Sequence, residues 1–302
     1  MFKKLSIYAV AFIGAITFLS SCEKEYEQIE TIDDAKLTQY IASNNLQATK
    51  DPSGFYYQIV NPGTGENFKN TDSVLYHFMI KSLDGKSYYD TKTGADNVGT
   101  LVGYSDQILQ SLSFPAVRTA ILALKPGGEA NVLLPSYLGF GRNGQPRLNV
   151  PSNEPLLINI TTLPERSQTL RDENLIKAFL ERNNLNATRD VSGIYYIIDR
   201  PGSGPEINSQ STVYPYYTGR TLDGTEFDSN KADTAVNFAL NGGVIPGWQK
   251  ALPLIKEGGK MRIFIPSVLA YGPNGRQDPT GAIKVKSNVV LDFDIEVRKV
   301  VN

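Results

Sequence analysis

The sequence predicts an α+β fold built from two tandem copies of one unit, each an antiparallel sheet with a short helix packed against it. The first observation is an internal repeat: residues 44–51 (NNLQATKD) return as residues 183–190 (NNLNATRD), and Gly54 returns as Gly193, an offset of 139 residues. The second is the content of 16 Tyr, 26 Gly and 17 Pro, which favours strands and turns. The third is a Leu-Asp-Gly turn between strand-like runs in both copies. Two repeats of this size indicate duplicated domains rather than a solenoid.

Composition excludes several functional classes. The chain is 41% hydrophobic and 20% charged, as in ordinary globular proteins, and its formal net charge of −1 gives no electrostatic basis for binding nucleic acid. The chain has one Cys, so it cannot form an intrachain disulfide. It has one His, which argues against metal sites with several His ligands and against a Ser-His-Asp triad. We therefore expect no metal and no cofactor.

The N-terminus has the pattern of an export signal. Lys3 and Lys4 precede an apolar run over residues 5–19, and the sequence LSSC ends at Cys22. This ending resembles the lipobox of bacterial lipoproteins, so we predict a lipoprotein signal peptide over residues 1–21, lipidation of Cys22 and an acidic tether over residues 22–32. The alternative is a chance free Cys beside a transmembrane anchor. The lipoprotein hypothesis implies a lipid-anchored protein of the bacterial cell envelope, at the outer membrane.

Each copy is predicted to open with a helix. Asp33 and Asp172 are candidate N-cap residues, and an Asn-Asn pair follows each helix as a stop signal. Apolar residues at i, i+3 and i+4 give each helix one face for packing against the sheet. They are Leu37, Tyr40 and Ile41 in the first copy and Ile176, Phe179 and Leu180 in the second.

The remainder of each copy is predicted as strands and turns. In the second copy, residues 260–266 form a strand with Met261, Ile263 and Ile265 on one face, residues 289–297 form the last strand, and residues 248–255 have helical spacing. A polar connector near residues 163–167 separates the copies. We therefore predict domains over residues 33–163 and 164–302.

The second copy contains six short motifs in a fixed order: YYTG at residues 216–219, LDGTEFDS at 222–229, VIPGW at 244–248, GGK at 258–260, LAYG at 269–272 and LDFDIE at 291–296. In sequence and order these motifs resemble the FKBP-type peptidyl-prolyl cis–trans isomerases. The resemblance implies a half-barrel sheet wrapped around a short helix, with a hydrophobic pocket between them that binds the proline ring.

The resemblance also implies the residues of that pocket. Seven would act on the bound peptide: Tyr217, Phe227, Asp228, Ile245, Trp248, Tyr271 and Phe293. Three would complete the substrate-binding surface: Val236, Val244 and Val285. Trp248 would form the floor and the two Phe residues the walls. The Ile245 N–H and the Tyr271 hydroxyl would bind peptide carbonyls, and Asp228 and the Tyr217 hydroxyl would meet at the rim. Taken singly, the aromatic residues would be interpreted as core; the ordered motifs favour a pocket.

The chemistry implied by the resemblance is rotation about an X–Pro bond. Its barrier of about 18–20 kcal/mol arises from lost amide resonance, so an apolar pocket and a few hydrogen bonds suffice and no cofactor is required. The implied partners are proline-containing client chains, the membrane through the lipid anchor, and macrolide inhibitors; the oligomeric state stays open. Three departures from the family are Val236 in place of an aromatic residue, VKS at residues 285–287 in place of Ile-Pro-Pro, and a polar loop at residues 273–284.

The first copy lacks most of the implied site residues. Its counterparts of Tyr217, Trp248, Tyr271 and Phe293 are Phe78, Val117, Phe140 and Ile158, and Tyr89-Asp90 matches Phe227-Asp228. We therefore predict a degenerate first domain with little or no activity, in which His77 is an ordinary strand residue. The leading hypothesis is an isomerase that assists the folding of exported proteins through the second domain. The alternatives are a non-catalytic peptide-binding chaperone and an envelope structural or surface-binding lipoprotein.

Overall fold

A computed structural model describes residues 28–107, 113–232 and 236–302. The predicted signal peptide and Cys22 lie outside these residues. The chain divides into two compact units: the first comprises residues up to Asp72 with Phe78–Asp90 and Leu101–Thr162, and the second comprises Leu163–Asn302 with the short segments Ser73–His77 and Thr91–Thr100. The predicted bounds of the two domains stay a prediction. None of the helices in the described ranges is long and apolar enough to span a membrane.

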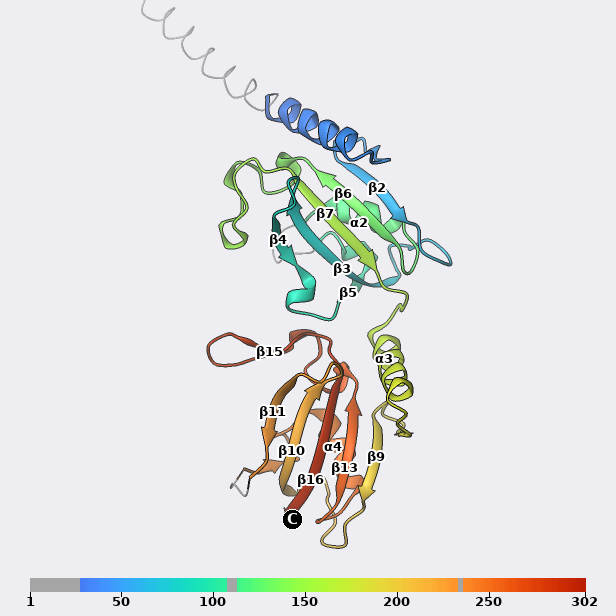
Figure 1. Cartoon of the computed structure of the whole chain (residues 1–302), viewed down its shortest axis with the longest axis vertical. Helices are drawn as coiled ribbons and strands as arrows, with labels where there is room; N and C mark the ends of the chain where they lie inside the picture. Colours follow the sequence, from blue (N-terminus) through green and yellow to red (C-terminus); the bar gives the residue numbers. More distant parts are fainter. Residues whose placement is uncertain (1–27, 108–112, 233–235) are drawn as a thin grey trace, which may run out of the picture. The chain divides into compact units, whose positions relative to one another are not determined.

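The first seven-stranded sheet has the strand order β1-β2-β6-β7-β3-β4, with β5 paired to β3 (Figure 1). Its elements are β1 (Thr49–Lys50), β2 (Tyr56–Asn61), β3 (Ser73–Ser82), β4 (Ser87–Asp90), β5 (Val98–Leu101), α2 (Pro115–Leu122), β6 (Glu129–Leu134) and β7 (Leu156–Thr162). A helix over residues 28–43 precedes them. Residues 28–32, which were predicted as part of the acidic tether, are helical, because Gln and Glu are good helix formers and continue the helix toward its N-terminus.

The second seven-stranded sheet has the order β11-β10-β16-β13-β9-β8, with β12 paired to β10. Its elements are α3 (Gln168–Arg182), β8 (Thr188–Arg189), β9 (Tyr195–Arg200), β10 (Thr212–Thr221), β11 (Glu226–Asn230), β12 (Phe238–Ala239), α4 (Pro246–Ala251), β13 (Lys260–Ile265) and β16 (Leu291–Val301). Between β13 and β16, β14 (Arg276–Gln277) and β15 (Ile283–Val285) form a separate two-stranded hairpin. The antiparallel α+β class and the helix before each sheet confirm the predicted fold class.

The two faces of the second sheet pack against different helices. Met261, Ile263 and Ile265 point to the side of α4, where Trp248 and Ala251 lie in the same core cluster. Phe264 points to the opposite side and packs with Ile176, Phe179 and Leu180 of α3. The alternation follows the period of two along a strand, and it confirms the predicted apolar face of α3.

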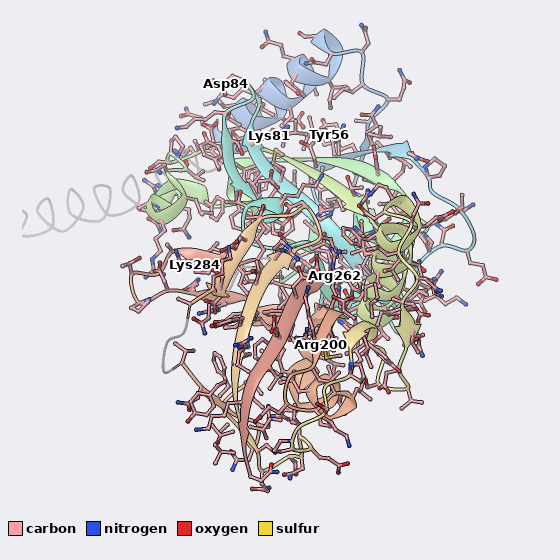
Figure 2. All side chains as sticks on the ribbon, turned by 60° about the horizontal axis from the view of Figure 1, so that its bottom comes forward. Tyr56, Lys81, Asp84, Arg200, Arg262 and Lys284 are labelled. Carbon is pink, nitrogen blue, oxygen red and sulfur yellow. The ribbon has the colours of Figure 1, made fainter. Side chains whose placement is uncertain are left out.

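An ion pair shares the α3 side of the second sheet. The Arg262 guanidinium (labelled in Figure 2) donates to both carboxylate oxygens of Asp292, at 2.9 and 2.7 Å, and lies 5.1 Å from the ring centroid of Phe264. The bidentate pair satisfies the Asp292 carboxylate, which is buried. This cluster belongs to the packing of the sheet and lies on the opposite face from Trp248.

Three sequence expectations about element ends were wrong. Asp172 does not cap α3, because the helix begins at Gln168 and the Ser167 side chain accepts from Leu170 N–H. Asp33 likewise lies inside its helix. The short helix expected at residues 248–255 begins at Pro246 instead, since a Pro at the first helical position has its φ already set. It ends at Ala251 and continues as a 3-10 turn over Leu252–Leu254.

Candidate active site in the second unit

A cavity of about 360 Å³ lies at the N-terminal end of α4. Its walls come from β10, β11, β12, β16, the segment before α4, and the segment around β14. The lining residues are Tyr217, Asp228, Phe238, Gly242, Gly243, Val244, Ile245, Trp248, Tyr271, Arg276 and Phe293. We call this the aromatic cavity.

Trp248 forms the floor of the aromatic cavity. Its ring centroid lies 5.3 Å from Tyr217, 5.4 Å from Phe238 and 5.3 Å from Phe293, with interplanar angles between 72° and 86°. Edge-to-face contacts of this kind place the positive ring edges against negative faces and hold the cluster rigidly. The side chain is only 4% exposed, and its Nε1 has no hydrogen-bond partner among the described residues. A buried, unpaired donor is costly, so it marks a place where a ligand can contribute an acceptor.

Glycine sets how closely α4 approaches the sheet. A Cβ on Gly247 would lie 2.4 Å from Ile265 Cγ2 of β13, so any larger residue would push the helix outward. Pro246 at the first helical position and an extended Ile245 at the N-cap start the helix directly beneath the cavity. The VIPGW motif therefore brings the Trp248 ring up to the sheet and leaves the Ile245 backbone at the cavity wall.

The far wall is built from Phe293 of β16 with Phe227 of β11 behind it. The two rings meet edge to face at 5.6 Å, and Phe227 also contacts the ring of Tyr271 at 6.4 Å. Gly219 of β10 makes room for both, since a Cβ there would lie 2.5 Å from Phe293 Cε1 and 2.8 Å from Phe227 Cζ. Phe227 thus supports the wall without lining the cavity.

Four polar side chains form one rim. Arg276 Nη1 donates to Asp228 Oδ2 at 2.9 Å and lies 3.4 Å from Tyr271 Oη. The Tyr217 hydroxyl donates to Asp228 as well. The pKa of Tyr217 is raised to about 12, mainly by burial and secondly by the negative charge of the adjacent Asp228 carboxylate. Tyr217 therefore stays protonated at neutral pH and remains a hydrogen-bond donor.

The structure brings together seven of the ten residues predicted for the site. Tyr217, Asp228, Val244, Ile245, Trp248, Tyr271 and Phe293 all line the aromatic cavity. Phe227 lies one layer behind the wall. Val236 is 40% exposed and Val285 is buried within the core at 3% exposure, and neither lines the cavity.

Four cavity residues were missing from the sequence prediction: Phe238, Gly242, Gly243 and Arg276. Phe238 of β12 contacts both Tyr217 and Trp248, at 5.7 and 5.4 Å. The resemblance placed an aromatic residue near this position and could have found it. Arg276 belongs to the polar loop that departs from the family, so no sequence pattern indicated it. Of the predicted loop over residues 273–284, it alone is among the lining residues.

Part of the second unit is similar to a known protein family. Residues 204–298 match the family described as FKBP-type peptidyl-prolyl cis-trans isomerase. The probable FKBP-type peptidyl-prolyl cis-trans isomerase FkpA of Neisseria meningitidis is 39% identical over 130 residues, which are 41% of this chain and 44% of the relative. The solved structure of AtFKBP13 is 30% identical and covers 38% of this chain and 98% of its own, with a TM-score of 0.35. Residues 204–298 of the second unit are similar to the FKBP-type family, and we call this unit the FKBP-type unit.

A further relative matches a similar length of this chain. The outer membrane protein MIP of Legionella longbeachae is 40% identical over 115 residues, which are 36% of this chain and 49% of the relative. The chain spans about half the length of the curated relatives it matches. The six ordered motifs of the sequence fall within or beside the matched residues, which confirms the predicted resemblance.

The first unit has different side chains at the matching positions. Val117 of α2 and Ile158 of β7 are fully buried where the FKBP-type unit has Trp248 and Phe293. Phe114, the counterpart of Ile245, is buried and packs edge to face on Phe140 at 5.5 Å. Phe78 stacks on Tyr89 at 5.3 Å. Apolar packing is retained in this unit, whereas the hydroxyl groups of Tyr217 and Tyr271 have no counterpart.

Proposed function

We propose that the chain is a peptidyl-prolyl cis–trans isomerase that acts on proline-containing polypeptides at the aromatic cavity. The observation that carries the proposal is the cage of Tyr217, Phe238 and Phe293 around Trp248, with the hydroxyl of Tyr271 and the carboxylate of Asp228 at one rim. The small, apolar pyrrolidine ring of proline fits such a cage, and its amide would lie against the polar rim.

The cavity suits an amide rotation. The planar amide is stabilised by resonance, and the twisted transition state has lost that charge separation, so it is the less polar of the two. An apolar enclosure therefore disfavours the planar form more than the twisted one. The Ile245 N–H and the Tyr271 hydroxyl would hold the flanking peptide carbonyls, and fixed donors of this kind require no reorganisation during the rotation.

The first unit would contribute little or no turnover. Phe114 occupies buried space beside Phe140, and Val117 lacks the ring that would form a floor. The unit would serve instead as a spacer or as a surface that binds clients or partners.

The proposed setting is the bacterial cell envelope, with the chain anchored by lipid on Cys22. One relative is named an outer membrane protein. In this setting the clients are exported chains, whose uncatalysed prolyl isomerisation takes about 10–100 s and can limit folding. Macrolides are the proposed inhibitors, since they would compete for the same apolar cavity.

A proline tetrapeptide assay tests the proposal. Trp248→Ala and Tyr271→Phe should each lower kcat/KM by roughly 10-fold or more, because each removes a group that contacts the proposed substrate. Tyr196→Phe is the matched control: Tyr196 packs against the same core cluster but does not line the cavity. Equal turnover in wild type, Trp248→Ala and Tyr271→Phe would rule out this site.

The second candidate is a non-catalytic peptide-binding chaperone. The hairpin of β14 and β15 favours it, because its polar sequence departs from the family at the cavity rim. This hypothesis predicts suppression of client aggregation with negligible turnover of the tetrapeptide, so the same assay separates the two.

A further inference from the structure

Arg276 connects the β14–β15 hairpin to the aromatic cavity. It lies in β14, where its backbone pairs with Val285, and its side chain reaches Asp228 of β11, 48 residues earlier in the chain. The guanidinium also lies 5.8 Å from the ring centroid of Tyr271. One side chain therefore contacts two walls of the cavity.

Stabilisation of the fold is a weak explanation for this contact. The side chains of Arg276 and Asp228 are 38% and 36% exposed, and ion pairs at such exposure contribute little to folding. Their position at the rim suggests a role in holding the rim groups in place.

The hydrogen bonds of Arg276 determine what Tyr271 can do. A hydroxyl carries one donor and two acceptor sites. Arg has donors only, so at the 3.4 Å contact Tyr271 Oη is the acceptor and its own O–H remains to be donated elsewhere. Asp228 accepts from both Tyr217 and Arg276, so it is held between them in the hydrogen-bonded series Tyr217–Asp228–Arg276–Tyr271.

The internal repeat provides a comparison. The segment Gly272–Arg276 (GPNGR) matches Gly141–Gln145 (GRNGQ). In both segments the glycines at the first and fourth positions have positive φ, 53° and 62° in the second unit and 56° and 57° in the first. The backbone turn is therefore the same in both units. The first unit has Gln145 where the second has Arg276, and it has Phe140 where the second has Tyr271. The cationic Arg276 therefore occurs in the unit that has the Tyr271 hydroxyl, and the matching positions of the first unit have neither group.

We propose that Arg276 is a positioning residue of the isomerase site, which turns the Tyr271 O–H toward a peptide carbonyl and fixes the Asp228 carboxylate across the rim. The inference rests on the proposed function. It assigns to the catalytic unit one residue, Arg276, of the polar hairpin where this chain departs from its family.

The test is a mutant cycle on the full chain. Arg276→Gln copies the residue of the first unit, whose matching turn folds with it. It should lower kcat about tenfold and change KM little, because orientation matters most in the transition state. Arg276→Lys, which keeps one charge and a donor, should recover part of the loss. The double variant Arg276→Gln/Tyr271→Phe should lose less activity than the product of the two single losses, because both changes act on Tyr271.

Lys284→Met is the matched control, because Lys284 is a cation on the same hairpin that pairs with Asp278 at 3.5 Å and does not line the cavity. Its activity should stay within about twofold of wild type. Wild-type activity in Arg276→Gln, or losses that multiply in the double variant, would overturn the inference.

The isomerase proposal and the role of Arg276 can be tested separately. If wild type shows no turnover, the isomerase proposal is lost, and the same cycle is measured as tetrapeptide affinity through the fluorescence of Trp248, the only Trp in the chain. A non-multiplicative loss of affinity then supports the role of Arg276 in holding Tyr271. Equal affinity of wild type and Arg276→Gln overturns it.

Discussion

Asp172 Oδ2 accepts hydrogen bonds from both the backbone N–H and the Oγ of Ser267, each at 2.7 Å. In the first unit, Asp33 Oδ2 accepts the same pair from Ser136, at 2.7 and 2.6 Å. Each contact ties the opening helix of a unit to the 3-10 turn that follows a central strand. Since the contact occurs both with and without the residues of the aromatic cavity, it belongs to the fold rather than to catalysis.

Removing the carboxylate of Asp172 should destabilise the second unit. Asp172→Ala leaves the N–H and Oγ of Ser267 buried and without their acceptor, at a cost of about 3 kcal/mol. Urea unfolding followed by Trp248 fluorescence measures the loss, because the only Trp reports on this unit. An unchanged midpoint would show that the contact contributes nothing to stability.

The stability of wild type relative to Asp172→Asn should depend on pH. Burial raises the pKa of Asp172, so the folded chain holds the proton more tightly than the unfolded chain. The resulting stabilisation is fully present below the unfolded pKa of about 4 and is lost as the pH rises through the folded pKa. The free energy of unfolding of wild type should therefore rise relative to that of Asp172→Asn as the pH falls from 7 to 4.

Asp223 offers a control of opposite sign. The hydrogen bond from Thr221 lowers the pKa of Asp223, so its contribution is present above the unfolded pKa and is lost as the pH falls. The free energy of unfolding of wild type should therefore fall relative to that of Asp223→Asn as the pH drops below the unfolded pKa of about 4. Parallel stability curves for wild type and Asp172→Asn would contradict the assignment.

Gly219→Ala should damage the cavity wall. The added Cβ would meet the rings of Phe293 and Phe227, and overpacking of this kind costs about 1–3 kcal/mol. Turnover of the proline tetrapeptide should fall with it, because Phe293 must move. Gly224→Ala is the comparison for the general cost of replacing a glycine: no atom lies within 4 Å of the added Cβ, although its positive φ of 90° adds backbone strain. Full turnover in Gly219→Ala would show that the wall is not tightly packed.

Ionisation of Tyr217 should not limit the reaction at alkaline pH. With its pKa raised to about 12, the hydroxyl stays neutral and continues to donate to Asp228 well above its ordinary range. The kcat/KM profile between pH 7 and pH 9.5 should therefore show no step that is removed in Tyr217→Phe. Such a step would place the pKa of Tyr217 within the measured range.

Cys22→Ser tests the proposed anchor. The acyl chains each contribute about 0.8 kcal/mol per buried CH₂, so their loss should release the chain from the membrane fraction. Fractionation with an antibody against the chain measures this, and the released protein should keep its tetrapeptide activity. A Cys22→Ser chain that stays with the membrane would exclude lipid as the anchor.

Local patterns were sufficient for much of the molecule. The apolar faces of the opening helices and the antiparallel α+β class follow from spacing and turn residues, because these depend on neighbours a few positions away. The duplication follows from direct comparison of residues 44–51 with residues 183–190. The six ordered motifs also identified seven of the lining residues of the aromatic cavity, including Trp248.

Long-range partners could not be found in this way. Asp is a residue type that commonly caps helices, yet Ser167 caps α3 and Asp172 binds Ser267, 95 residues away. Arg276 lies in a segment whose sequence shows neither helix nor strand periodicity, yet the segment forms β14 and Arg276 meets Asp228 across the cavity. Both outcomes depend on which segments the folded sheet brings within hydrogen-bond distance, and no local spacing in the chain encodes that distance.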